Sequence, residues 1–231
     1  MKRFFNKNKY IKMKNSKTLS HSIVFVDHIF KNGVQPNMPP QQINNPFSQL
    51  CNLLFLQSVV GINGLAVNNP VLQSFVFGNI IIQNNLYPPQ FSVIHNTSSI
   101  ENKEIKEIAK TLIIKGNLEN VIGAIGVNHT LYIANTDNKI NLKNLVCQNH
   151  IAEAFNEINV RLVFKLNEFT TLTLNISDAS INKEKAIYIQ TNFNSQLSSA
   201  NSFNDILNAN FYEQLNEKLD IIFEHNAKSQ H

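Results

Sequence analysis

The residues of this chain that could do chemistry are few and scattered, and the first candidates are a thiol and an imidazole three positions apart. Cys147 and His150 flank Gln148-Asn149, and on a helix this spacing can ligate a metal or pair a nucleophile with a base. Two ligands do not make a metal site, however. Cys147 also shares its helical face with apolar residues, where a free cysteine is ordinarily a small buried hydrophobe. We therefore expect Cys147 to belong to the core.

The histidines form no recognisable catalytic pattern along the sequence. Asp27 and His28 are neighbours in a segment that reads as a strand, so their side chains are expected to face opposite ways rather than to form a catalytic pair. An enzyme would need a buried cluster of the remaining candidates in one pocket, and their dispersal would count against catalysis. Those candidates are His28, His95, Cys147 and His150.

Other motifs that name a reaction are missing from the sequence. Gly123 and Gly126 lie within a strand pattern, and Gly61-Ile62-Asn63-Gly64 lacks the Lys-Ser/Thr pair of a phosphate-binding loop. Cys51 and Cys147 are too few for the disulfide framework of a small secreted protein, which favours a reducing compartment. We predict no catalytic, cofactor-binding or metal-binding residues, and a protein that is not an enzyme.

A long segment without charge dominates the organisation of the chain. Residues 32–100 contain no Lys, Arg, Asp or Glu, whereas about a quarter of the residues of a typical soluble domain are charged. Such a segment packs either against the charged remainder of its own chain or against another chain. For the second case, the candidate interface consists of four large apolar residues, namely Phe55, Val59, Phe75 and Phe77.

The N-terminus is a basic arm. Residues 1–20 hold seven of the 20 basic residues and no acidic one, which leaves 13 basic against 16 acidic residues, a net charge of −3, for the rest of the chain. The arm can neutralise phosphates of nucleic acid or anionic lipid, or serve as an import signal. The simpler alternative is a solvated, flexible terminus. Its candidate contacts are Lys2, Arg3, Lys7, Lys9, Lys12, Lys14 and Lys17.

Periodicity predicts the elements of the N-terminal part. We expect a buried strand over Ser22–Phe30, and a helix over Pro46–Val60 that begins after the N-cap Asn45. Two further strands are expected over Val71–Ile82 and Gln90–Ile94. No apolar run reaches the eighteen or so residues that cross a bilayer, so no membrane span is predicted.

Helices and strands alternate in the prediction after residue 98. Apolar residues at helical spacing indicate a helix that ends at Gly116, a second helix over about Asn141–Ile158, and a last amphipathic helix with an acidic outer face. A hairpin is expected to turn at Asn128-His129, which would leave His129 exposed. Strict alternation predicts a second hairpin, over 160–166 and 171–176, and a further strand over 187–193.

These elements define an α+β fold, with a mixed, largely antiparallel sheet and three helices in the C-terminal part, plus an uncharged β-rich N-terminal extension. We divide the chain into a basic flexible arm (1–20), an uncharged Asn/Pro-rich extension (21–97) and an α+β domain (98–226).

The predicted order from residue 99 onward is helix, two strands, helix, three strands, helix. Over residues 99–225 this order resembles the roadblock family of small dimerising adaptors, which is related in outline to longin and profilin-like folds. The segments that carry the resemblance are Ile105–Ile113, the hairpin Val121–Val127 with Thr130–Ala134, and Ile151–Ile158. The resemblance implies a non-enzymatic scaffold that pairs through sheet edges and central helices, engages a small GTPase or a larger complex, and has no catalytic residues.

Two hypotheses of function follow from the sequence. The first is a cytoplasmic, non-catalytic subunit for protein–protein interaction or assembly, which self-associates or binds a protein partner. The alternative is a coat or capsid-like structural protein whose basic arm contacts nucleic acid or another anionic surface. The chain would then reside in a virion, or in an organelle if the arm is an import signal.

The assembly hypothesis predicts a stable oligomer that survives removal of residues 1–20, because the predicted interface lies in the uncharged segment. Light scattering at low and high salt, on the full chain and on a chain without residues 1–20, measures the mass. A monodisperse monomer at micromolar concentration would contradict the hypothesis, and large assemblies that vanish without the arm would favour the coat protein.

Overall fold

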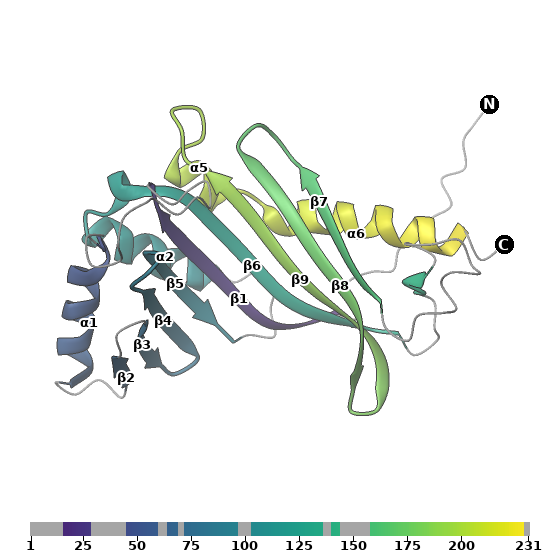
Figure 1. The fold of residues 1–231 in the computed structure, drawn as a ribbon, viewed down its shortest axis with the longest axis horizontal. Helices are drawn as coiled ribbons and strands as arrows, with labels where there is room; N and C mark the ends of the chain where they lie inside the picture. The colour runs from purple at the N-terminus through teal and green to yellow at the C-terminus, as the bar shows by residue number, and fades with distance from the viewer. Residues whose placement is uncertain are drawn as a thin grey trace.

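Two long strands lie side by side at the centre of the molecule, which is described here from a computed structural model. They are β1 (Ser16–Asp27) and β6 (Ile122–Ala134), and they pair antiparallel over nearly their whole length (Figure 1). The structure describes residues 16–28, 45–59, 64–68, 72–96, 103–135, 140–143 and 158–228. Within these residues, every other strand is added outward from the β1–β6 pair.

On one side of the pair, β1 is followed by α1 (Ser48–Val59) and by a meander of four strands. The meander strands are β2 (Gly64–Asn68), β3 (Leu72–Phe77), β4 (Ile80–Asn85) and β5 (Gln90–His95). The last of them returns to pair with β1. The final strand of this half, β5, therefore lies next to β1 in the sheet.

The other side repeats this plan. After α2 (Lys103–Lys115) and the short 3₁₀ helix η4 (Glu119–Val121), β6 is followed by β7 (Asn159–Lys165), β8 (Thr170–Ile181) and β9 (Glu184–Gln196). The last of these, β9, returns to pair with β6. The described residues thus form one nine-stranded sheet in the order β2-β3-β4-β5-β1-β6-β9-β8-β7, with β1 and β6 in equivalent positions.

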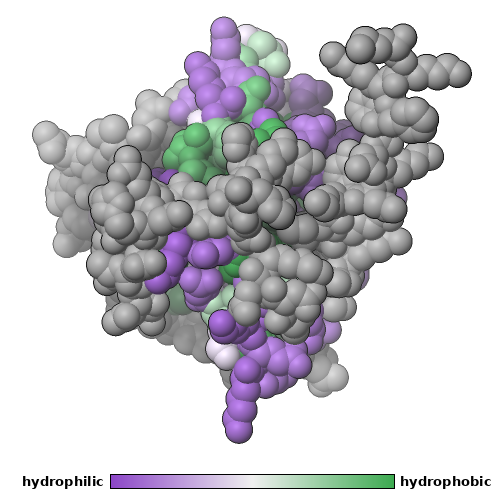
Figure 2. All heavy atoms as spheres, turned by 90° about the vertical axis from the view of Figure 1, so that its right-hand side faces the viewer, coloured by the Kyte–Doolittle hydropathy of each residue, from purple (hydrophilic) through white to green (hydrophobic). Residues whose placement is uncertain are grey.

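Helices cover one face of this sheet, which we call the inner face. The chain ends in α5 (Phe203–Asn208) and α6 (Phe211–Lys228), and α6 runs across β7–β9 in Figure 1. Phe25 of β1 stacks with Phe91 of β5 and with Phe203 of α5, and Phe193 of β9 contacts Phe211 of α6. Seen from the end of the sheet, hydrophilic residues occupy the top and bottom of the view and hydrophobic ones show between them (Figure 2).

The predicted fold class was wrong: the chain is mostly β, and strands from both predicted parts join one sheet. The last five residues of the predicted arm, Ser16–Ser20, lie in β1, where Lys17 pairs with Tyr132. The segment Val71–Ile82 forms two strands rather than one, because the chain turns at Gly78-Asn79, where Gly78 has a φ of +59°.

The hairpin predicted at Asn128-His129 was also wrong, because β6 runs straight through both residues. Asn128 pairs with Ser22 of β1 on one side and with Asn192 of β9 on the other, so ladder hydrogen bonds on both sides hold the strand extended. The hairpin that carried the roadblock resemblance is therefore not formed. The second predicted helix falls almost entirely on residues 144–157, outside the described residues, and the resemblance stays a prediction.

Other expected elements are confirmed. They are α1, α2, the three strands β7–β9 and the final amphipathic helix. Asn45 precedes α1 as predicted, and its side-chain Oδ1 accepts the N–H of Phe47 at 2.9 Å. Among the described residues, no helix is long and apolar enough to cross a membrane.

The charge-free segment builds α1 and β2–β5, and it buries its polar groups as amides. Asn84 is fully buried; its Nδ2 donates to Gln73 Oε1 at 2.9 Å, and its Oδ1 accepts from Asn45 Nδ2 at 3.1 Å. Phe75 and Phe91 are buried beside them in the same core. Packing against its own chain therefore explains the missing charge in these strands, which was the first of the two explanations considered.

Candidate functional site

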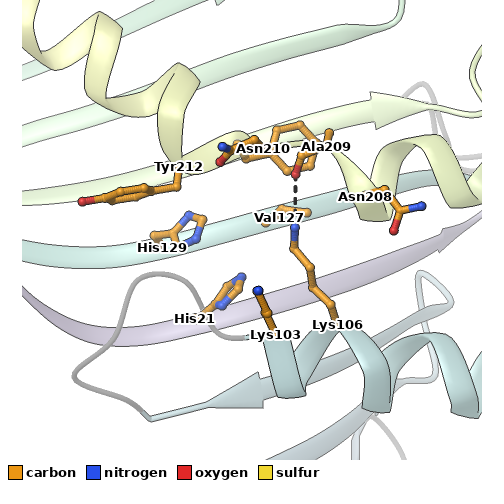
Figure 3. A pocket seen from close by; sticks show the side chains of 10 residues that line it. His21, Lys103, Lys106, Val127, His129, Asn208, Ala209, Asn210 and Tyr212 are labelled. Atoms are coloured by element: carbon orange, nitrogen blue, oxygen red, sulfur yellow. Dashed lines mark hydrogen bonds between the residues drawn. The ribbon is translucent and has the colours of Figure 1, made fainter.

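A cavity of about 270 Å³ opens on the inner face where β1, β6 and the first residues of α2 and α6 meet (Figure 3). Its floor is formed by side chains of the two central strands. Its walls come from α2 and from the segment that joins α5 to α6. The lining residues are His21, Lys103, Lys106, Val127, His129, Asn208, Ala209, Asn210, Phe211 and Tyr212.

Two histidines form the floor of the cavity. His21 of β1 and His129 of β6 are direct partners in the strand register, so both side chains leave the sheet on the same face. Their rings stack, with centroids 4.3 Å apart and planes at 20°. His95 of β5 is the partner of His21 on its other side. Three histidines therefore stand in one row across β5, β1 and β6.

His21 is the most unusual group of the site. It is 2% exposed, and neither ring nitrogen has a hydrogen-bond partner within the described residues. Burial, and after it the charges of His129, Lys106 and His95, lowers the pKa of His21 from 6.5 to about 3. The ring is therefore neutral at neutral pH. It keeps one N–H donor and one acceptor nitrogen unpaired at the edge of the cavity.

His129 is held in place by β9. Its backbone N–H donates to the hydroxyl of Thr191 at 3.0 Å, and the same hydroxyl lies 3.4 Å from its ring Nδ1. Phe193 meets the His129 ring edge-on, with centroids 6.5 Å apart. Because Thr191 and Phe193 are themselves buried, the orientation of the His129 ring is fixed by packing.

Positive charge and helix N-termini surround the histidines. Lys103 and Lys106 lie in the first turn of α2, and the Lys106 ammonium donates to the carbonyl of Ala209 at 3.1 Å. Asn210 caps α6, since its Oδ1 accepts the N–H of Glu213 at 3.2 Å. The backbone N–H groups that precede Glu213 at the start of α6 have no carbonyl partner within the helix, and the positive end of the helix dipole lies at the cavity.

The arrangement suits an anion better than a metal ion. The lone pairs of two stacked imidazoles point in parallel directions rather than at a common point, and the two lysines repel a cation. No group of three or more His, Cys, Asp or Glu within the described residues could hold a metal ion. Among the described residues that line the cavity there is no Asp or Glu.

The residues singled out from the sequence lie elsewhere. The arm residues before Ser16 are outside the described residues, and Lys17 lies exposed at the start of β1. Phe75 is 1% exposed in the core and Phe77 is half-buried against it. Phe55 and Val59 belong to α1, and their side chains are outside the described part. The candidate interface stays a prediction, and neither Phe75 nor Phe77 lines the cavity.

Of the chemical candidates from the sequence, His95 lies in the row beside His21, whereas His28 follows the end of β1. His28 is 60% exposed, and its Nδ1 lies 3.2 Å from Asp27 Oδ1; the two side chains meet because β1 ends at Asp27. Cys147 and His150 lie outside the described residues. Cys51 is buried in the core, and burial raises the pKa of its thiol to about 12, so it stays protonated.

Sequence reasoning missed the two histidines that the structure brings together. The alternation of side chains along a strand is the signal that could have identified them. His21 lies two residues before the buried Ile23, and His129 lies midway between the buried Val127 and Leu131, so both histidines fall on the buried side of their strands. The turn assigned at Asn128-His129 broke that pattern and placed His129 on the surface. In the structure it is 3% exposed.

No model of a known protein family matches the chain, and no curated protein matches it at a significant level. The functional conclusion therefore depends on the cavity itself.

The buried neutral state of His21 predicts an acid-sensitive fold. In the unfolded chain His21 takes up a proton below its ordinary pKa of 6.5, whereas in the folded chain it stays neutral down to about pH 3. The folded state then loses about 1.4 kcal/mol for each pH unit between these values. The contribution is complete above pH 6.5 and is lost as the pH falls.

Urea unfolding at pH 7, 6, 5 and 4 measures this loss by comparison with the variant His21→Phe. Phenylalanine keeps a stacking ring without a titrating group, and all carboxylates are common to both proteins. Between pH 6 and pH 4, the free energy of unfolding of the parent protein should decrease more steeply than that of the variant. The difference between the two slopes should be about 1.4 kcal/mol per pH unit. Parallel curves would contradict the assignment.

Proposed function

We propose that the protein binds a small molecule that carries a compact oxyanion, a phosphate or carboxylate group, in the cavity between His21, Lys106 and the N-terminus of α6. The observation that carries the proposal is His21, a buried imidazole at the cavity whose two ring nitrogens have no hydrogen-bond partner within the described residues. A buried polar group without a partner costs about 1–3 kcal/mol. A ligand atom that bonds His21 would remove this cost.

Charge supports an anion as the ligand. Lys103 and Lys106 project from one wall, and His129 lies next to His21 on the floor. The same positive groups that hold the pKa of His21 low would attract an anion. An anion would also stabilise the protonated form of His21, so its binding should strengthen as the pH falls.

The donors around the cavity match an oxyanion. Backbone N–H groups at the start of α6 bind anions through hydrogen bonds and the helix dipole. The Lys106 ammonium, which donates to the carbonyl of Ala209, brings a positive charge to the same cavity. The start of α6 and this lysine therefore lie on two sides of the space beside His21.

Size restricts the ligand to a small molecule. At roughly 30 Å³ for each water molecule, a volume of about 270 Å³ holds on the order of nine waters. Val127, Phe211 and Tyr212 supply apolar surface beside the charged groups. The remainder of the ligand is therefore expected to be compact and partly apolar.

The assembly role predicted from the sequence is the second candidate, and the edges of the sheet favour it. Among the described strands, β2 and β7 each pair on one side only. An unpaired edge can accept a strand of another chain. Val163 of β7 is 60% exposed, a large apolar side chain at this edge. Light scattering of the full chain at micromolar concentration tests this candidate separately from ligand binding.

Isothermal titration of the full chain with inorganic phosphate, and separately with acetate, tests the proposed function. We expect saturable binding of at least one of the two at pH 7. Lys106→Gln should weaken binding about tenfold or more, since a charged hydrogen bond contributes about 1.5–3 kcal/mol.

The matched control is Lys115→Gln, which removes the same charge from the exposed end of α2, away from the cavity. It should leave the affinity within about twofold of the parent. Lys103→Gln serves as a second cavity variant in case the loss of the Lys106 bond to Ala209 alters the fold. Absence of binding by the parent protein, or equal effects of the cavity and control substitutions, would contradict the proposal.

A further inference from the structure

The face of the sheet opposite α6, which we call the outer face, carries an ordered grid of polar side chains. In β7, β8 and β9 buried residues alternate with exposed or half-buried ones. The strand registers align the outward residues into rows that cross β1, β6, β9, β8 and β7. The rows hold Lys17, Tyr132, Tyr188, Ser177 and Asn159; then Ser20, Thr130, Gln190, Asn175 and Arg161; then Ser22, Asn128, Asn192, Thr173 and Val163; then Val24, Gly126, Asn194, Thr171 and Lys165.

The charges in these rows are all positive. Lys17, Arg161 and Lys165 are exposed, and none of the residues named in the rows is Asp or Glu. This distribution is opposite in sign to that of the body, whose acidic residues outnumber its basic ones once the arm is set aside. Three positive charges among these rows, on a mildly acidic body, favour contact with a polyanion such as a phosphodiester backbone.

Two tyrosines occupy neighbouring positions in the first row. Tyr132 of β6 and Tyr188 of β9 are direct partners across the strands, and both are half-buried. The hydroxyl of Tyr188 accepts a hydrogen bond from Gln190 Nε2 at 3.1 Å. Aromatic side chains on an open sheet are platforms on which unpaired nucleic-acid bases stack.

The amides beside the tyrosines are held in place by one another. Asn128 Nδ2 donates to Ser22 Oγ at 3.2 Å, and Asn128 Oδ1 accepts from Asn192 Nδ2. Asn175 and Gln190 are exposed. Each amide offers both donors and an acceptor, the groups that recognise the hydrogen-bonding edges of bases.

We propose that the outer face binds single-stranded nucleic acid, with phosphates against Lys17, Arg161 and Lys165 and bases on Tyr132 and Tyr188. The bases must be unpaired, because a base inside a duplex cannot stack on a side chain. Residues 1–15 carry six further basic residues and no acidic one. The inference is independent of the cavity, which opens on the inner face.

Fluorescence anisotropy of labelled 15-nucleotide oligouridine and oligothymidine, titrated with the full chain at 50 and 200 mM salt, tests the inference. One or both strands should bind more tightly than a duplex of the same length, and more weakly at high salt. Arg161→Gln with Lys165→Gln should lower the slope of log K against log salt by about 1.4, since each contact with a single strand contributes about 0.7. Tyr132→Leu with Tyr188→Leu should weaken binding at least about fivefold.

The matched control for charge is Lys110→Gln with Lys115→Gln on α2, which covers the inner face, and it should leave the salt slope unchanged. Circular dichroism of each variant verifies the fold. A full chain that binds neither strand at 50 mM salt would overturn the inference. Equal affinity for single strands and duplex would also overturn it. The same holds if the outer-face substitutions leave the affinity unchanged while substitution of the basic residues before Ser16 by glutamine abolishes binding.

Discussion

The antiparallel pairing of β1 with β6 is the interaction on which the rest of the structure depends. Each strand begins one half of the chain, and each half returns its last strand to the outer side of its own first strand. Without the central pair, the two halves would be separate sheets with exposed edges, which are prone to associate. The same pairing places His21 opposite His129 on one face and Ser22 opposite Asn128 on the other. One register therefore positions both the cavity and the outer rows.

Burial of polar groups in this sheet follows two different rules. In the charge-free half, Asn84, Gln73 and Asn45 bond one another, so the interior contains amides whose hydrogen bonds are satisfied. In the centre, His21 is as deeply buried but has no partner among the described residues. The unsatisfied imidazole of His21, which lies beside two lysines, is the feature on which the proposed ligand site depends.

Much of the local structure could be predicted from the sequence, because periodicity is a local signal. The helical spacing around Ile105 and the alternation from Val160 to Phe193 gave α2 and β7–β9. The architecture could not be predicted. Asn128-His129 has the composition of a turn, yet it lies in a strand. The strand partners that hold it there are distant in sequence: Asn192 is more than 60 residues away and Ser22 about a hundred. The site was missed for the same reason, because only this long-range pairing brings His129 to His21.

A cysteine cross-link between β1 and β6 tests this account most directly. In Ser22→Cys with Asn128→Cys, the two thiols replace side chains that bond across the strand pair, at a Cα separation of about 4.5–5.5 Å that a disulfide can span. In Ser22→Cys with Tyr132→Cys, the second thiol lies four residues, about 13 Å, further along β6. Peptide mass spectrometry after mild oxidation should find the 22–128 bridge and no 22–132 bridge. A missing 22–128 bridge would contradict the pairing, the cavity and the outer rows together.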